Sequence, residues 1–366
     1  MVTQANSAAL VASLLAASLL APAAQAKDYL LTGAKPDQLV MIDPAARKVE
    51  KSFTVPEAGT GILTITPAPD GRTAYVITNH WESVAGIDLD SGEQVFRADL
   101  SSDEVRVKAT FAMDISPDGK ELFVFQSPVR LGQGEYEVLP HPGSPSTTPA
   151  AGIGAEPIRS FEAPRRTAIL TMSKDGSRLY AVSWDIYILD PKTGAEIGRH
   201  PLRTWDRENY SEPDVLDVWP QWEVAGTFST PVYAVRTDLD PTDPAAYKTG
   251  LVTLDLDSGD FKVTDFEDTA VIIFSSVINP VRSNEAYGVY TTLSKIDHEK
   301  GELLNRIDLD HTYYTVNIAS DGSELYVGGT MNDVSVYDTD TLEKIGRIEI
   351  PNGADQALGS LRVIQR

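Results

Sequence analysis

Two acidic phrases, DLDSG at 88–92 and DLDSG at 255–259, carry the residue types of a calcium site. Carboxylates two residues apart supply the oxygen ligands that Ca²⁺ prefers. A full EF-hand loop also needs a third Asp or Asn and a Glu at position twelve, and both phrases lack these residues. At the end of a strand the same residues form a turn, in which Asp accepts backbone N–H groups and Gly takes a positive φ. We therefore interpret both phrases as turns.

The histidines do not have the spacing of a metal site, because no two of them are two or four residues apart. They are His80, His141, His200, His298 and His311. His311 differs in its position, since it opens the phrase HTYYTVN (311–317), which leads into a strand that we expect near the centre of the fold. There it is either a packing residue or a functional one. No GxSxG, P-loop or GxGxxG motif stands out.

Aromatic residues concentrate in a long insertion at about 205–250, which holds three of the five tryptophans. Trp219 and Trp222 in this insertion, together with Tyr313 and Tyr314, are candidates for contacting a partner or walling a substrate pocket, because interfaces are enriched in Trp and Tyr. His311 joins them by position. The alternative is that these aromatic side chains pack the insertion onto its own sheet. We expect no catalytic, cofactor-binding or metal-binding residue in this chain.

Charge and cysteine content exclude several classes of function. The chain has 53 acidic and 31 basic residues, a net charge of −22, and no cysteine. This charge opposes binding to nucleic-acid phosphates or to an anionic membrane surface, so we expect neither partner. Without cysteine the chain cannot form disulfides, Cys-ligated zinc sites, iron–sulfur clusters or covalent haem attachments.

An internal repeat positions these candidate residues. A phrase of alternating apolar residues, an Asp, a turn and a second short strand occurs six times, with its aspartates at Asp43, Asp88, Asp190, Asp255, Asp297 and Asp338. The spacings are 45, 102, 65, 42 and 41 residues, so the gap of 102 spans two units and the repeat number is seven. Seven units in residues 27–366 give about 49 residues each, the length of a four-stranded propeller blade.

A second phrase, a strand–Asp-Gly–strand hairpin, precedes the first in most units, and helix patterns are nearly absent. It occurs at 64–79, 114–127, 171–183 and 317–329, with a degenerate copy at 278–290. Together the two phrases predict an all-β, seven-bladed β-propeller with four-stranded blades. The N-terminal unit has only three strands, so we expect the C-terminal strand SLRVIQR (360–366) to join the N-terminal blade and close the ring.

The missing seventh copy falls on an irregular, proline-rich segment at 139–156. Proline at this density is incompatible with a middle strand. One explanation is a divergent loop. The other is a local shift of the reading frame, because codons allowed for residues 143–149 spell Ile-Ala-Val-Tyr-Asp-Thr in another frame, which is the missing strand phrase. The coding DNA distinguishes the two.

The N-terminus has the pattern of a secretory signal peptide. Residues 8–21 are apolar, and Ala24-Gln25-Ala26 follows as a cleavage signal, so we expect residues 1–26 to be removed after Ala26 and residues 27–366 to form the propeller in the periplasm. The alternative is a membrane anchor, for which a run of 14 residues is too short, since a span needs about 20.

Four phrases go beyond a generic propeller repeat: PDGKELFVFQSPVR (117–130), YSEPDVLDVW (210–219), DPTDPAAYKTGL (240–251) and HTYYTVN (311–317). They resemble the β subunit of quinohemoprotein amine dehydrogenase. The repeat as a whole is similar to the wider YVTN propeller class, which includes the methylamine dehydrogenase heavy chain. The resemblance covers residues 27–366 and departs from the family at 139–156, where the family has a regular strand.

The resemblance implies a periplasmic enzyme of three different subunits that oxidises primary amines to aldehyde and ammonia. A small subunit carries cysteine tryptophylquinone, and a di-haem cytochrome c subunit passes the electrons to a soluble copper protein or cytochrome. The propeller is the non-catalytic subunit that seats the quinone-bearing subunit and helps to wall its substrate pocket. The alternatives are a stand-alone YVTN-type binding protein and a metal-dependent propeller hydrolase such as a lactonase.

Overall fold

A computed structural model describes residues 26–109, 111–139, 143, 146–216, 219, 221–356 and 360–366 of the chain. Residues 1–25 of the expected signal peptide, and His141, lie outside the described residues. Within the described ranges the elements are antiparallel β-strands and four one-turn 3-10 helices, which are η1 (Asn79–Trp81), η2 (Pro149–Ala151), η3 (Pro244–Ala246) and η4 (Pro351–Gly353).

The described residues form six four-stranded sheets, each ordered from an innermost strand outward. One contains β30 (Leu361–Gln365), β1 (Asp28–Ala34), β2 (Gln38–Asp43) and β3 (Lys48–Thr54). The next contains β4 (Ile65–Pro67), β5 (Thr73–Thr78), β6 (Ser83–Asp88) and β7 (Gln94–Asp99). Another contains β14 (Ile169–Met172), β15 (Leu179–Val182), β16 (Ile186–Leu189) and β17 (Glu196–His200).

The remaining four-stranded sheets follow the same order along the chain. They are β18 (Asp214–Val215), β19 (Thr227–Val235), β20 (Tyr247–Asp255) and β21 (Phe261–Asp268); β22 (Ile273–Ile278), β23 (Glu285–Tyr290), β24 (Thr292–Asp297) and β25 (Glu302–Asp308); and β26 (Thr315–Ile318), β27 (Glu324–Gly328), β28 (Asp333–Asp338) and β29 (Lys344–Glu349). Two three-stranded sheets contain β9 (Met113–Ile115), β10 (Leu122–Val124) and β13 (Ser146–Thr147), and β8 (Val105–Lys108), β11 (Ser127–Leu131) and β12 (Tyr136–Val138).

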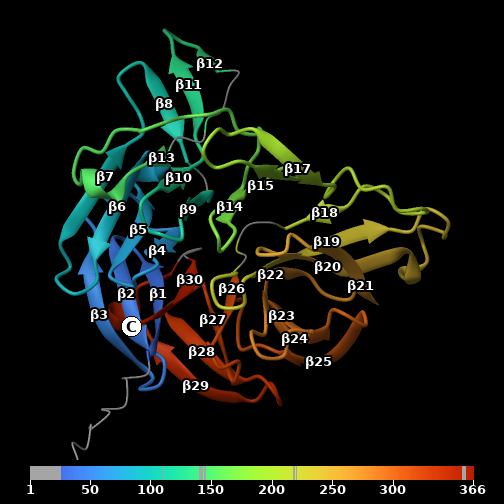
Figure 1. Cartoon of the computed structure of the whole chain (residues 1–366). Coiled ribbons are helices and arrows are strands. Elements are labelled where there is room, and N and C mark those ends of the chain that lie inside the picture. Colours follow the sequence, from blue (N-terminus) through green and yellow to red (C-terminus); the bar gives the residue numbers. More distant parts are fainter. Residues whose placement is uncertain are drawn as a thin grey trace, which may run out of the picture.

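Apart from the sheet of β8, β11 and β12, which lies at the rim, the sheets are arranged radially around a common centre (Figure 1). Their innermost strands touch their neighbours: β30 contacts β4, β4 contacts β9, β9 contacts β14, β22 contacts β26, and β26 contacts β30. Each sheet packs face to face against the next, so the middle strands β6 and β28 are buried on both faces, whereas the outermost strand β29 is mostly exposed. This arrangement is a β-propeller.

Aspartates of the repeated phrase close the turn between the third and fourth strands of a sheet. The side chain of Asp255 accepts hydrogen bonds from the backbone N–H groups of Asp257 and Ser258 at 3.0 and 2.7 Å. Gly259 follows with a φ of 83°. Because the phrase at 88–92 shows the same bonds and a positive φ at its glycine, the structure confirms that both DLDSG phrases are turns.

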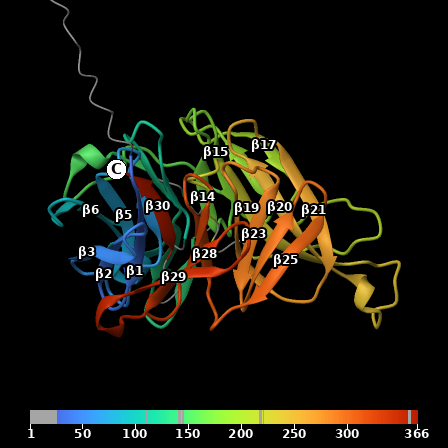
Figure 2. The ribbon, with the colours of Figure 1, turned by 90° about the horizontal axis from the view of Figure 1, so that it is seen from below.

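The first and last described strands, β1 and β30, lie in one sheet. β30 pairs antiparallel with β1, with Leu30 opposite Val363, and the backbone N–H groups of Lys27 and Arg366 donate to each other's carbonyl at 2.7 and 3.0 Å. Figure 2 shows β30, in dark red, beside the blue N-terminal strands. Leu361 and Val363 are buried in a core that also contains residues of β27, β28 and β29. Ile364 is buried in another core with residues of β4, β5 and β6, so β30 contributes to packing on both sides.

The proline-rich segment 139–156 contains β13, which pairs with β10 as the third strand of its sheet. The hydroxyl of Ser146 on this strand is buried and has no hydrogen-bond partner among the described residues. This is unusual, because a buried hydroxyl group in a strand normally has a hydrogen-bond partner. The two explanations for this segment, a divergent loop and a shifted reading frame, stay predictions that the coding DNA tests.

We expect removal of residues 360–366 to lower the melting temperature far more than loss of an exposed tail would. Without β30, the edge of β1 loses its partner and the apolar residues of two sheets are uncovered. Differential scanning calorimetry of the truncated chain measures the effect, with the full-length chain as the control. A melting temperature equal to that of the control would contradict the prediction.

Candidate functional site

The central channel has two mouths. The first residues of the innermost strands lie at one mouth, and their last residues lie at the other. A cavity of about 10 Å³ gathers residues at or just before the first residue of an innermost strand, namely Thr64, Phe111, Ile169 and Ser360. A cavity of about 300 Å³ gathers residues at or just after the last residue of such strands, namely Pro67, Ser320 and Gln365. We call these the start mouth and the end mouth.

A segment that follows β18 passes from one mouth to the other. β18 is only two residues long, and the described residues between it and β19 belong to no strand. Trp219 and Gln221 line the small cavity at the start mouth, whereas Trp222, Glu223 and Val224 line the larger cavity at the end mouth. These five residues, which we call the crossing segment, therefore contribute to both cavities.

The Glu223 carboxylate holds the crossing segment in place. It accepts hydrogen bonds from Asn317 Nδ2 on β26 at 2.6 Å, from the backbone N–H of Val363 at 2.9 Å and from Arg362 Nη1 at 3.0 Å. Arg362 is buried, donates its Nε–H to the carbonyl of Ile65 at 3.1 Å, and places its guanidinium 4.4 Å from the ring of Trp222. The Glu223 carboxylate thus connects two innermost strands, β26 and β30, with the crossing segment, and Arg362 extends the contact to β4.

Asp114, in the middle of β9, faces the end-mouth cavity. Its oxygens accept hydrogen bonds from the backbone N–H groups of Ile115 at 2.9 Å and Met172 at 2.8 Å. Burial raises the pKa of Asp114 to about 6, although these N–H groups and the Arg362 guanidinium act in the opposite direction. A carboxyl group with a perturbed pKa at the wall of a central cavity is a typical feature of a binding site.

At the start mouth, four aromatic rings form a stack that is half-buried. Trp219 lies 5.8 Å from Phe274 and 5.2 Å from Tyr314, measured between ring centroids, and Phe274 lies 3.9 Å from Tyr290. The carbonyl of Trp219 accepts a hydrogen bond from Ser275 Oγ at 2.7 Å, which fixes the crossing segment against β22. The structure therefore brings together Trp219 and Tyr314, two of the residues proposed from the sequence.

The other sequence candidates lie elsewhere. Tyr313 is fully buried, and its hydroxyl donates to Asp333 at 2.9 Å. His311 Nε2 lies 2.8 Å from the other oxygen of Asp333, and the His311 and Tyr313 rings are 4.0 Å apart. This pair supports the sheet of β26–β29 from within. Trp222 lines the end mouth, away from the aromatic stack.

Sequence reasoning did not find Asp114, Glu223 or Arg362 at the end mouth, or Phe274 and Tyr290 in the aromatic stack. A signal was present for two of them. Asp114 and Arg362 are charged residues in the middle of apolar phrases, FAMDI and LRVI, that the repeat assigns to innermost strands. Charged residues are almost never buried without a partner. A charged residue in an innermost strand is therefore expected to face the channel or to have a charged partner there.

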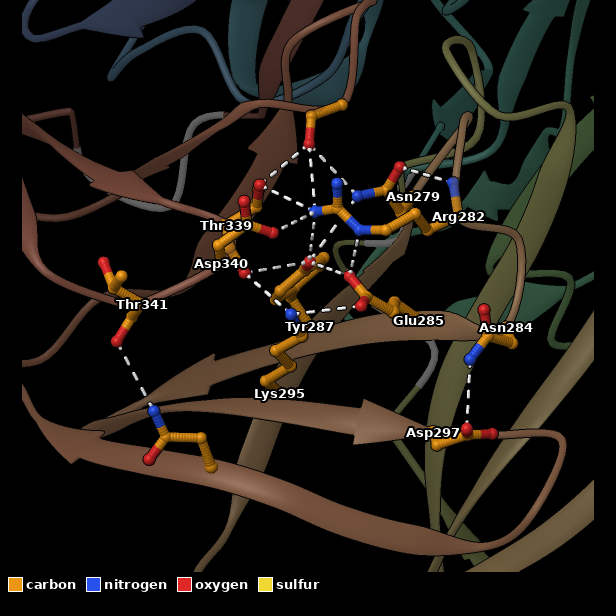
Figure 3. Close-up of polar contacts among 12 residues, drawn as sticks. Asn279, Arg282, Asn284, Glu285, Tyr287, Lys295, Asp297, Thr339, Asp340 and Thr341 are labelled. Atoms are coloured by element: carbon orange, nitrogen blue, oxygen red, sulfur yellow. Dashed lines mark hydrogen bonds and ion pairs between the residues drawn. The ribbon is translucent and has the colours of Figure 1, made fainter.

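A further polar cluster joins two neighbouring sheets (Figure 3). The Glu285 carboxylate accepts hydrogen bonds from Tyr287 Oη at 2.6 Å and from Arg282 Nε at 2.7 Å, and it lies 3.1 Å from Lys295 Nζ. Arg282 and Lys295 also donate to Thr339, which follows β28, at 2.8 and 3.1 Å. The charged groups satisfy one another here, so the cluster serves to connect the sheets.

Within the described ranges of the chain, no group of three or more His, Cys, Asp and Glu side chains is placed to hold a metal ion. The described residues also include no helix with the length and hydropathy needed to cross a membrane.

Comparison with solved structures supports the β-propeller fold. Hydrazine synthase of Kuenenia stuttgartiensis aligns with a TM-score of 0.58 and 14% identity, over 84% of this chain and 90% of the other. A functionally unknown protein from Desulfotomaculum acetoxidans DSM 771 aligns with a TM-score of 0.60 and 9% identity, over 92% and 98%. The periplasmic gluconolactonase PpgL of Pseudomonas aeruginosa aligns with a TM-score of 0.56 and 15% identity, over 92% and 99%.

At these identities the likeness shows the fold alone. Neither a protein-family model nor a curated protein matches the chain.

We expect the stability of the protein to depend on pH through Asp114. Its pKa is higher in the folded chain than the ordinary value of 3.8, so the folded state binds the proton more tightly, and stability falls as the pH rises from about 4 to above 6. A shift of about two units corresponds to about 3 kcal/mol. Between these two pH values, the free energy of unfolding of the wild type should therefore decrease by up to that amount more than the free energy of unfolding of Asp114→Asn does.

Urea unfolding at about pH 4.5 and pH 7.5 measures this difference, and Asp260→Asn, which changes an exposed carboxylate, is the matched control. Parallel pH profiles of the wild type and Asp114→Asn would show that Asp114 titrates normally.

Proposed function

We propose that this chain is the non-catalytic propeller subunit of a periplasmic quinohemoprotein amine dehydrogenase, an enzyme that oxidises primary amines to aldehyde and ammonia. In this proposal the propeller has seven blades, counting the sheet of β9, β10 and β13 as one, and pairing of β30 with β1 closes the ring. Residues 1–26 are the export signal, and residues 27–366 form the single propeller domain.

One observation carries the proposal. The phrases YSEPDVLDVW and HTYYTVN, two of those on which the resemblance rests, each contribute a ring to the same aromatic stack. Trp219 and Tyr314 are 95 residues apart in the chain, yet their rings stack at 5.2 Å. A docking surface needs such a cluster of aromatic residues from distant segments, because the residues that supply most of the binding energy lie together at the centre of an interface.

The aromatic stack is suited to seat a protein subunit. Its rings are half-buried, so each keeps an accessible face or edge while its position is fixed by neighbouring rings. Rigid aromatic side chains lose little conformational entropy on binding, and a few such residues supply most of the binding energy of an interface. In the proposed complex the quinone-bearing small subunit occupies the start mouth, and the stack helps to wall its amine pocket.

The redox chemistry in this proposal belongs to the partner subunits. Cysteine tryptophylquinone in the small subunit oxidises the amine, and the di-haem cytochrome c subunit passes the electrons to a soluble copper protein or cytochrome. This chain has no cysteine and so no side chain to which either group could be attached in the way these cofactors require. Its own contribution is to position the small subunit and to exclude water from the shared pocket.

We expect Trp219→Ala and Tyr314→Ala to weaken assembly with the small subunit. Loss of a central aromatic residue from an interface costs on the order of 2 kcal/mol or more, about a thirtyfold loss in affinity. Co-purification from cells that express all three subunits measures assembly, and the KM for amine reports the pocket.

Tyr136→Ala, which changes a 77% exposed ring on β12, is the matched control. Thermal unfolding of each purified variant separates a lost interface from a destabilised propeller. If both stack variants are folded and assemble like the control, the small subunit binds another face.

We also expect the chain expressed without its partners to be colourless and to lack amine dehydrogenase activity, since the cofactors supply the reaction. An absorption spectrum of the purified chain and an amine-dependent dye-reduction assay measure this. A haem or quinone band in the single chain would contradict the proposal. Purification of the native protein as a colourless monomer would instead favour a stand-alone YVTN-type binding protein or a propeller hydrolase.

A further inference from the structure

The end-mouth cavity lies at the opposite end of the channel from the aromatic stack, and the proposed docking of a subunit leaves it unused. It has a volume of about 300 Å³. Three charged side chains line it, namely Asp114, Glu223 and Arg362, and Trp222, Pro67 and Val363 supply apolar wall. The pairing of these three charges decides what the cavity can bind.

Two of the charges neutralise each other. Arg362 Nη1 and Glu223 Oε2 are 3.0 Å apart, and both side chains are largely withdrawn from solvent. Glu223 accepts two further hydrogen bonds, and the Arg362 guanidinium is covered on one side by Trp222. This pair therefore has its partners within the protein.

The third charge has no ion pair. Among the described residues, no Lys, Arg or His nitrogen lies within ion-pair distance of Asp114, although the Arg362 guanidinium is near enough to lower its pKa. Its hydrogen bonds come from the two backbone N–H groups of Ile115 and Met172. Asp114 is half-buried, and a carboxylate without an ion-pair partner in such a position is costly to the fold, because burial disfavours its charged form. The cavity in front of Asp114 provides room for the missing positive charge.

We propose that the end mouth binds an ammonium or guanidinium group, which forms an ion pair with Asp114. A cation restores neutrality to a cavity whose three side chains sum to one negative charge, whereas an anion would add to it. The nitrogen group lies against the Asp114 carboxylate, and its carbon chain contacts the apolar wall at Pro67 and Val363. The strongly acidic chain, at −22, attracts such a ligand from solution.

The group can come from a free organic cation or from a Lys or Arg side chain of a bound protein. Both sources present the same chemistry to Asp114. They differ in the size of the molecule that carries the nitrogen group, and this difference distinguishes them.

Isothermal titration calorimetry with methylguanidinium tests the proposal, and N-methylurea is the uncharged control of the same shape. We expect one site for methylguanidinium per chain, at least tenfold weaker binding of N-methylurea, and at least tenfold weaker binding of methylguanidinium to Asp114→Asn. Asp260→Asn makes the same change of charge at an exposed position and should bind like the wild type. Equal binding to wild type and Asp114→Asn, or no binding to the wild type, would overturn the proposal.

A second readout is independent of affinity. Pairing with a cation stabilises the Asp114 carboxylate, so binding near pH 6 releases protons, and the enthalpy then depends on the ionisation enthalpy of the buffer. The charged groups that face Asp114 from the other elements are Arg362 and Glu223. Proton release should be absent in Asp114→Asn. Tighter binding of the peptide acetyl-Gly-Arg-Gly-amide than of methylguanidinium assigns the site to a protein side chain, and exclusion of the peptide assigns it to a free cation.

Discussion

The channel of this propeller depends on one carboxylate. β18 ends after two residues, so the crossing segment has no strand ladder to satisfy its backbone or fix its path. Glu223 replaces the ladder, because it receives a hydrogen bond from β26 and two from β30, one of them charged. Breaking a buried ion pair by removing one partner leaves an uncompensated charge, so this contact is costly to lose. Without it, Arg362 would lose its partner, and Trp222, which packs on the Arg362 guanidinium, would lose its fixed place at the end mouth.

The crossing segment gives the two mouths different chemistry. At the start mouth, Trp219 completes a stack of aromatic rings, a surface suited to a protein partner. At the end mouth, the segment supplies Glu223, which neutralises Arg362 and leaves Asp114 as the net charge of the cavity. The crossing segment therefore contributes both to the proposed docking surface and to the proposed cation cavity. Asp114 is ionised at neutral pH, and this lowers the stability of the folded chain because burial has raised its pKa. Binding sites often contain residues that lower stability in this way.

Much of the fold could be predicted because its signals are local. The aspartates of the repeated phrase bond to a backbone N–H group three residues later, and most of them, such as Asp255, also to one two residues later. Each turn is therefore readable in a window of five residues. The Asp-Gly hairpins and the alternation of apolar residues are equally local, and together they predict an all-β propeller. The candidate site could be predicted in part, because the composition of two phrases pointed to Trp219 and Tyr314. That their side chains contact each other could not be predicted, because it depends on how the propeller sheets are arranged.

The sequence by itself determined the turns, the strands, the all-β propeller and the absence of any cysteine-based chemistry. Only the tertiary structure decided what the charged and aromatic residues do. Asp114 has a raised pKa because strands far away in the chain bury it, and Arg362 is neutralised by Glu223, which lies 139 residues earlier. Tyr313 and Tyr314 are neighbours, yet one is buried on Asp333 and the other joins the aromatic stack, since successive residues of an extended chain point to opposite sides. Burial and charge pairing arise from contacts between distant segments, and no local pattern encodes them.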